Sequence, residues 1–457
     1  KNVLIIFVDD LRPELHSFGA TYIHSPNIDS LNAKGRGFTR HYVNSPSCGP
    51  SRYAFLTGQY GLEYRGEYNQ SLFKRSEDVN DQNASIAPSM PEWFRNNGYT
   101  TVSVGKVSHH PGGRGGDHWD DTNVPEMPKA WDKHLMPVAE WQNPKGAMHG
   151  LAYGKVRTPN SRDVIESVDG NDKSYPDGHI AEEGLRQLNE LAKDDKPFFL
   201  AIGLIKPHLP FGVPKKYLDL YENVEIPPAL HPEKPKGRTT WHGSGEFMNY
   251  NRWNKDPRKD KDFALKLKRC YAACVSYADK HVGDIIQKLK ETGADKNTIV
   301  VLWGDHGWHL GEHAIWGKHS LFEESLRSPL IIYDPSMENK GQMSNAIVES
   351  VDVLPTLCDM TNLPIPYFAD GTSLKPIVDN VHAQGHEAVA FKSHATTIRT
   401  DQYRFTQHKN GVLELYDHKH PMAEQVNIAV DNPLIVEQLR TLMLYKMGNR
   451  AFIFSNR

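Results

Sequence analysis

Five short apolar runs constrain the fold of this chain more than any other feature of its sequence. Each contains Val, Ile, Leu or Phe, and all but Thr101–Val104 lack the regular polar alternation of a strand that faces water on one side. They are Val3–Val8, Thr101–Val104, Phe198–Ile202, Thr298–Trp303 and Leu330–Tyr333. Such runs are typical of strands buried on both faces, so they predict a sheet covered by helices on each side.

Helical segments lie between these runs. Residues Pro91–Asn97, Ile180–Leu191 and Asp262–Thr292 have helical apolar spacing, and the first and third stop at Gly98 and Gly293. The alternation predicts an α/β fold with a large, mostly parallel sheet flanked by helices. Cys270 and Cys274 lie one turn apart on the long helix, where a packing face is favoured over a metal or redox pair.

The last part of the chain follows a different pattern. Short strands are expected at Ala388–Phe391, Thr397–Thr400, Tyr403–Gln407 and Leu413–Tyr416, followed by a helix at Pro433–Met447. The turn signal Lys409-Asn410-Gly411 predicts a hairpin. We therefore expect a large domain at residues 1–375 and a small antiparallel-sheet-plus-helix subdomain at residues 376–457.

Composition excludes several classes of partner. The chain of 457 residues has 53 basic and 56 acidic residues and a net charge of −3, so it carries no nucleic-acid footprint. No apolar run approaches the length of a membrane span. Four cysteines are too few for a disulfide scaffold. The chain opens directly on its first strand, and we expect that a signal peptide has been trimmed.

Charged residues follow four of the buried runs. In chain order they are Asp9 and Asp10, Lys106 and His109, Lys206 and His208, and Asp305 and His306. Taken singly, paired aspartates often cap turns and a Lys-Pro-His segment is often surface. Ligands of open α/β sheets bind outside the carboxyl ends of the strands, however, so these clusters are expected to meet in one crevice.

Cys48 opens the run Cys48-Gly49-Pro50-Ser51-Arg52, which is followed by Phe55-Leu56-Thr57-Gly58. Pro50 suits the first turn of a helix and Gly58 its end, which places Cys48 beside the exposed N–H groups of the helix start. An anion there is stabilised by the helix dipole, and Arg52 adds a fixed positive charge. The alternative for an isolated cysteine is a small buried residue ahead of a short helix.

These residues resemble the sulfatase family along nearly the whole chain. Cys48-x-Pro50-Ser51-Arg52-x-x-x-Leu56-Thr57-Gly58 is similar to the sequence in which that family converts its cysteine to formylglycine. Within the family the chain is most similar to the iduronate-2-sulfatase branch, because two residues separate Lys106 from His109 and because His306 stands where many members have Asn. Further similarity lies in Val8–Pro13, Ser25–Asp29, Lys206–Phe211, Asp305–Lys318, Ile398–Thr400 and Glu414–Tyr416.

The resemblance implies an alkaline-phosphatase-like fold and a role for each site residue. Formylglycine at position 48, hydrated to a gem-diol, would attack the sulfur of a sulfate ester. A divalent cation would be held by Asp9, Asp10, Cys48, Asp305 and His306. Three carboxylates favour a hard cation, Ca²⁺ first and Mg²⁺ second, over a two-zinc site. Arg52, Lys106 and Lys318 would surround the sulfate, His208 with Lys318 would protonate the leaving oxygen, and His109 would accept the proton that releases sulfate.

The implied function is hydrolysis of O-sulfate esters in sulfated carbohydrates. We expect exo action on uronate-containing oligosaccharides of the glycosaminoglycan or algal ulvan type, since a near-neutral chain lacks a broad basic face. Trp-rich loops at residues 110–176 and 228–260 would either contact the sugar or fasten themselves to the body. A formylglycine-generating or sulfatase-maturating enzyme is the implied partner.

Two alternatives stay open from the sequence. One is a phosphodiesterase or phosphonate hydrolase of the same superfold, and the other is a non-catalytic binder of sulfated polysaccharide. A secreted or periplasmic bacterial location is expected, with a lysosomal one as the alternative.

Overall fold

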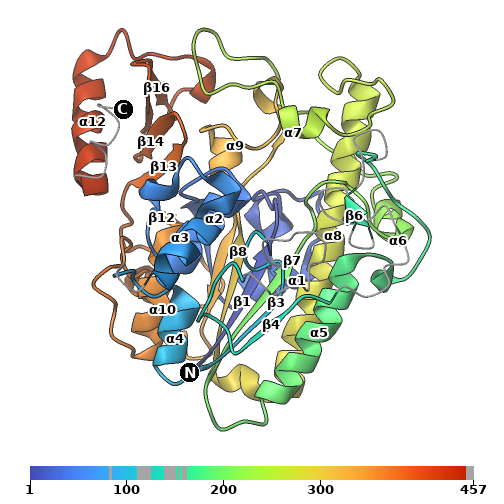
Figure 1. Cartoon of the computed structure of the whole chain (residues 1–457). Coiled ribbons are helices and arrows are strands. Elements are labelled where there is room, and N and C mark those ends of the chain that lie inside the picture. Colours follow the sequence, from blue (N-terminus) through green and yellow to red (C-terminus); the bar gives the residue numbers. More distant parts are fainter. Residues whose placement is uncertain (82–84, 111–124, 138–150, 153–154, 157–161, 449–457) are drawn as a thin grey trace.

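The computed structural model describes residues 1–81, 85–110, 125–137, 151–152, 155–156 and 162–448. Its centre is an eight-stranded sheet with the order β12-β2-β11-β8-β1-β7-β3-β4 (Figure 1). Its strands are β1 (Asn2–Val8), β2 (Arg36–Tyr42), β3 (Thr100–Gly105), β4 (Lys133–Leu135), β7 (Phe198–Leu204), β8 (Thr298–Gly304), β11 (Leu330–Tyr333) and β12 (Met343–Glu349). Each of the five predicted apolar runs forms a strand of this sheet.

The sheet is mostly parallel, as predicted. Strands β8, β1, β7, β3 and β4 pair in parallel, and β12 pairs in parallel with β2. Strand β11 runs antiparallel to both of its neighbours, β8 and β2. Its four-residue run did not reveal this direction, because a strand buried on both faces looks the same in either orientation.

Helices cover both faces of the sheet (Figure 1). Along β1, Leu4, Ile6 and Val8 pack into the core with α1 (Pro26–Asn32), α5 (Pro176–Leu191) and α8 (Lys261–Glu291). The alternate residues Val3, Ile5 and Phe7 pack with α2 (Cys48–Thr57), α4 (Met90–Asn96) and α10 (Val353–Thr361). Since successive side chains of a strand point to opposite faces, the continuous apolar run follows from this double covering.

The predicted helices are confirmed within a few residues. Helix α8 ends at Glu291, and Gly293 just beyond it has a φ of 73°, a conformation that favours glycine. Cys270 and Cys274 lie on the face of α8 that is buried in the core, as expected of a packing face. Shorter elements are α3 (Ser71–Asn80), α6 (Lys215–Asp219), α7 (Gly245–Met248), α9 (Glu323–Leu326), α11 (Lys375–Asp379), β5 (Leu151–Ala152), β6 (Lys155–Val156), β9 (His309–Leu310) and β10 (Trp316–Gly317).

A small antiparallel sheet near the C-terminus matches the expected strands. Its order is β13 (Ala388–Lys392), β14 (Ala395–Arg399), β15 (Tyr403–His408) and β16 (Leu413–Asp417), and α12 (Pro433–Met447) packs against it. The backbone N–H of Phe391 donates to Asn44 O at 2.9 Å, which joins β13 to the segment before α2. The division at residue 375 stays a prediction. Within the described ranges, no helix is both long and apolar enough to cross a membrane.

Candidate active site

Helix α2 carries Cys48 at its first residue, as the sequence predicts. Ser47 precedes it with extended backbone, and Gly58 ends the helix in the left-handed region with a φ of 65°. The hydroxyl of Ser51 donates to the main-chain oxygen of Asp305, which ties the helix start to the end of β8. Cys48 is buried, so its sulfur faces the protein interior at the carboxyl edge of the sheet.

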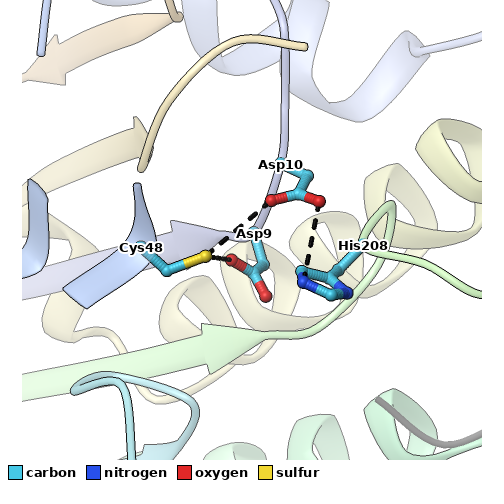
Figure 2. A group of neighbouring side chains, drawn as sticks. All are labelled: Asp9, Asp10, Cys48 and His208. Atoms are coloured by element: carbon cyan, nitrogen blue, oxygen red, sulfur yellow. Dashed lines mark hydrogen bonds and ion pairs between the residues drawn. The ribbon is translucent and has the colours of Figure 1, made fainter. Parts of the chain in front are cut away.

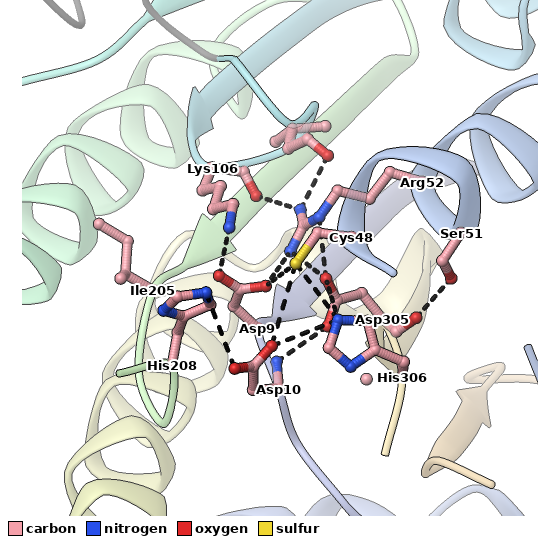
Figure 3. Close-up of polar contacts among 12 residues, drawn as sticks. Asp9, Asp10, Cys48, Ser51, Arg52, Lys106, Ile205, His208, Asp305 and His306 are labelled. Atoms are coloured by element: carbon pink, nitrogen blue, oxygen red, sulfur yellow. Dashed lines mark hydrogen bonds and ion pairs between the residues drawn. The ribbon is translucent and has the colours of Figure 1, made fainter. Parts of the chain in front are cut away.

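At least one charged residue from the end of each of β1, β3, β7 and β8 lies in the cluster around this sulfur: Asp9, Asp10, Lys106, His208, Asp305 and His306 (Figure 3; Figure 2 shows Asp9, Asp10 and His208). The Cys48 Sγ lies 3.5 Å from Asp9 Oδ1 and 3.9 Å from Asp10 Oδ1. His306 Nε2 and Lys318 Nζ each lie 3.2 Å from it. The strand ends therefore converge as predicted for these six residues, whereas Lys206 binds main-chain oxygens of its own loop.

Arg52 and Lys106 hold Asp9 in place. Lys106 Nζ donates to Asp9 Oδ2, and an Arg52 nitrogen lies 3.1 Å from Asp9 Oδ1. Arg52 also contacts Asp305 Oδ2 at 3.0 Å and donates to the main-chain oxygens of Lys106 and Val107. The guanidinium is thus surrounded by protein acceptors and aligns the carboxylates of two strands.

Asp10 is held from several sides. Its φ is 59°, and its backbone N–H donates to Asp305 Oδ1 at 2.9 Å. Its Oδ1 accepts from Lys318 Nζ at 2.8 Å and lies 3.3 Å from His306 Nε2. The Tyr271 hydroxyl of α8 donates to the main-chain oxygen of Asp10 at 2.8 Å. A left-handed backbone in a non-glycine residue is costly. These contacts hold Asp10 in that conformation, in which the carboxylates of Asp9 and Asp10 both face Cys48.

His208 approaches from the loop after β7. Its Nδ1 lies 2.7 Å from Leu209 O, so Nδ1–H donates there and Nε2 faces the cluster. That nitrogen is 3.8 Å from Asp10 Oδ2 and 3.5 Å from Glu246 Oε1. The loop is clamped by Lys206, whose buried Nζ donates to the main-chain oxygens of His208 and Pro210. His109 lies three residues beyond Lys106, is buried, and packs edge to face on His110.

The protonation of the cluster follows from burial and from neighbouring charges. Burial alone would raise the pKa of Asp9, but Lys106, His208 and Arg52 lower it well below its usual value. Burial raises the pKa of Asp10 well above its usual range against the charge of Lys318, and Asp9 adds to the rise. Burial and Asp9 likewise raise the pKa of Asp305 to about 7. The protein cations therefore do not fully neutralise the three carboxylates.

The cluster fits a divalent cation. The donor atoms of Asp9, Cys48, Asp305 and His306 lie within 4.8 Å of one another, and Asp10 joins Asp9 and Cys48 in an overlapping group. Asp10 Oδ2 is buried and has no hydrogen-bond partner in the described part of the chain. Burial and Lys318 lower the pKa of His306 well below its usual value, which keeps the imidazole neutral as a metal ligand requires.

Glu246 is a site residue that the sequence reasoning missed. It lies on the four-residue helix α7 inside the long polar loop at 228–260, where no periodic pattern marks it. Its carboxylate contacts His208, lies 3.6 Å from Lys318 Nζ and lies 3.2 Å from His319 Nε2. The one signal in the sequence was that Glu246 lies within the Trp-rich segment at residues 228–260.

Two tryptophans of the Trp-rich loops contact the body of the protein. Trp241 Nε1 donates to His313 O at 2.8 Å, and Trp131 packs on the core residue Phe199 with ring centroids 6.1 Å apart. Trp253 is 47% exposed. Trp119 and Trp141 lie outside the described residues.

Comparison with known proteins gives the family. The family model described as Sulfatase matches residues 1–363, and the one described as N-sulphoglucosamine sulphohydrolase, C-terminal, matches residues 311–447. Mouse iduronate 2-sulfatase is 32% identical over 401 residues, covering 80% of this chain and 69% of the mouse protein. A sulfatase of Formosa agariphila is 30% identical over 443 residues, covering 94% of this chain and 83% of that protein.

The fold is also found in a solved structure. Phosphonate monoester hydrolase of Agrobacterium radiobacter superimposes with a TM-score of 0.77 at 21% identity, covering 98% of this chain and 96% of that one. The architecture is therefore the alkaline-phosphatase-like one expected from the sequence. From the family match, the similar sequences and this fold, the chain belongs to the sulfatase family of sulfuric ester hydrolases.

Proposed function

We propose that this enzyme carries formylglycine at position 48 and hydrolyses sulfate esters of uronate-containing oligosaccharides. The observation that carries the proposal is the position of Cys48, at the first residue of α2 and in contact with two carboxylates, an imidazole and an ammonium group. A hydrated formylglycine at this position supplies an oxygen nucleophile.

The cations of the site divide into two kinds. Lys318 Nζ lies directly beside the Cys48 sulfur, where it would contact the sulfate oxygens and stabilise charge as it develops. Lys106 contacts the Asp9 carboxylate, which in turn contacts the Cys48 sulfur, and Lys106 acts on the sulfate together with Lys318. Arg52 contacts Asp9 and Asp305, and we propose that it orients these carboxylates; its contact with the sulfate stays a prediction.

His208 is proposed as the general acid. Its Nδ1–H is fixed by Leu209 O, which leaves Nε2 as the atom that gives a proton to the leaving alcohol oxygen. Lys318 contacts Asp10, the same carboxylate that His208 approaches, so the two groups face one side of the cluster. His109 keeps its predicted role as the base that releases sulfate.

The metal is proposed to be Ca²⁺, with Mg²⁺ second. It would be held by Asp9, Asp10, Asp305, His306 and the modified residue 48. Three carboxylates and an imidazole suit a hard cation with mainly oxygen ligands. When bound, the ion neutralises sulfate charge and lowers the pKa of the nucleophile.

The substrate class is proposed from the similarity to iduronate 2-sulfatase. We expect a sulfated hexuronic acid at the end of a glycosaminoglycan or ulvan fragment, with exo action. A maturating enzyme would install the aldehyde, and the site of action would be secreted, periplasmic or lysosomal.

One screen tests the proposal. Purified protein bearing the aldehyde is incubated with heparan, dermatan and ulvan fragments of known structure, with a phosphonate monoester and with a phosphodiester, and sulfate or alcohol release is measured. We expect sulfate release from terminal uronate-containing units. Faster turnover of the phosphonate or phosphodiester would favour the alternative hydrolase, and internal desulfation with terminal sulfates untouched would contradict exo action.

A further inference from the structure

Lys392 brings a positive charge of the C-terminal sheet to the rim of the Cys48 cluster. It is the last residue of β13, and its Nζ donates to the main-chain oxygen of His319. His319 directly follows Lys318, whose Nζ lies 3.2 Å from the Cys48 sulfur. The N–H of His319 donates in turn to Pro46 O at 3.1 Å, two residues before Cys48. His319 therefore connects Lys392 both to Lys318 and to the segment that precedes Cys48.

Among the residues that the structure describes, the charge of Lys392 has no anionic partner. Within the described ranges, no carboxylate lies within 4.0 Å of its Nζ, whereas Lys318 contacts both Asp10 and Glu246. Burial lowers the pKa of Lys392 to about 8. A partly buried cation without a counter-charge is unfavourable, so an anion that binds beside it regains part of the lost solvation energy.

In the described part of the chain, the acidic side chain nearest this point is engaged by other cations. Glu246 lies 3.2 Å from His319 Nε2 and is paired with Lys318 and His208. The ring of His242 lies 6.4 Å from that of His319. Burial and the charge of Lys392 lower the pKa of His242 to about 3, so this imidazole is neutral at physiological pH. The rim at this point is therefore cationic and able to donate hydrogen bonds.

We propose that Lys392 binds the carboxylate of the uronate whose ring, or whose neighbouring ring, carries the scissile sulfate. This inference rests on the proposed function and adds a carboxylate subsite to it. The sulfate lies beside Lys318, while the carboxylate lies beside Lys392, which is bound to the main-chain oxygen of the residue that follows Lys318. The C-terminal sheet then contributes to substrate selection through this side chain.

The test compares two sulfated disaccharides that differ in one group. One carries the uronate carboxylate, and in the other that carboxylate is reduced to an alcohol. A charge-assisted hydrogen bond in a partly buried site corresponds to roughly a ten- to hundredfold change in kcat/KM. We expect the wild-type enzyme to prefer the uronate by this factor, and Lys392→Met to abolish the preference by raising KM. Lys392→Arg should restore most of it.

Two controls separate a subsite from a structural role. Lys392→Met should keep its activity on an aryl sulfate that has no carboxylate, and Lys409→Met, on the turn after β15, should behave as wild type on every substrate. Equal loss on the aryl sulfate and the uronate, or an unchanged preference in Lys392→Met, would overturn the subsite. A preference for a second sulfate over the carboxylate would overturn the carboxylate assignment. Hydrolysis of the aryl sulfate with neither disaccharide cleaved would instead overturn the proposed function.

Discussion

Replacing Arg52 by methionine removes a buried cation that joins two carboxylates. The Arg52 side chain is fully buried, and it lies 3.1 Å from Asp9 and 3.0 Å from Asp305. Met keeps most of the aliphatic volume but leaves both carboxylates without this partner. Breaking a buried ion pair by removing one member costs about 3–5 kcal/mol. For a chain of this length 1 kcal/mol shifts Tm by about 1 °C, so the expected fall in Tm is about 3–5 °C.

Arg186 is a matched control, because it also pairs with two carboxylates but does so at the protein surface. Arg186 on α5 also contacts two carboxylates, those of Glu183 and Glu190, but its side chain is 54% exposed. Surface ion pairs contribute about 0–1 kcal/mol, so Arg186→Met should lower Tm by no more than about 1 °C.

The assay is thermal unfolding of both variants and the wild type, with and without excess Ca²⁺. Because Asp9 and Asp305 in Arg52→Met can still bind a cation, added Ca²⁺ should raise the Tm of that variant as well as that of the wild type. Equal Tm losses in Arg52→Met and Arg186→Met would refute the reasoning from burial, and Tm values of both Arg52→Met and the wild type that excess Ca²⁺ leaves unchanged would contradict the proposed metal cluster.

Three further predictions follow from single side chains. His208→Ala should lower kcat/KM by about 10²–10⁴ on a carbohydrate sulfate but far less on an activated aryl sulfate, because only the poor leaving group needs a proton; equal losses would reject the general acid. Asp10→Asn should reduce the bound metal, measured by elemental analysis, and an undiminished metal content would exclude it as a ligand. Burial alone would lower the pKa of His386, but the carboxylates of Asp352 and Glu349 raise it from 6.5 to about 9. The stability that this charge contributes is therefore present below pH 6.5 and lost as pH rises through about 9, and an unchanged pH dependence of Tm in His386→Gln would contradict this.

The carboxyl ends of the strands were predictable because a run buried on both faces must end where polar residues begin. Asp9, Lys106, His208 and Asp305 each follow such a run, and the sheet edge brings them together. The start of α2 was predictable for a local reason, since Pro50 and Gly58 specify the two ends of a helix. Strand, turn and helix signals likewise gave the C-terminal sheet and α12.

Other parts depend on contacts that the sequence does not display. Strands β2 and β12 were missed. Arg36, Thr39 and Arg40 interrupt the apolar pattern of β2, and the two arginines donate hydrogen bonds to main-chain oxygens that are far away in the sequence. Glu246 was missed because α7 has only four residues and its position is set by packing. The role of Arg52 also needed the structure, because its acceptors come from three separate segments.

The modification of Cys48 tests the central claim most directly. Peptide mass spectrometry on active enzyme, with hydrazide trapping of aldehydes, gives the fraction of chains that carry formylglycine at position 48. Cys358, which is buried away from the site, is the internal control and should remain a thiol. The account predicts that kcat per chain rises in proportion to the aldehyde fraction and that Cys48→Ala is folded and inactive. Full activity in a preparation whose Cys48 is entirely an unmodified thiol would contradict it.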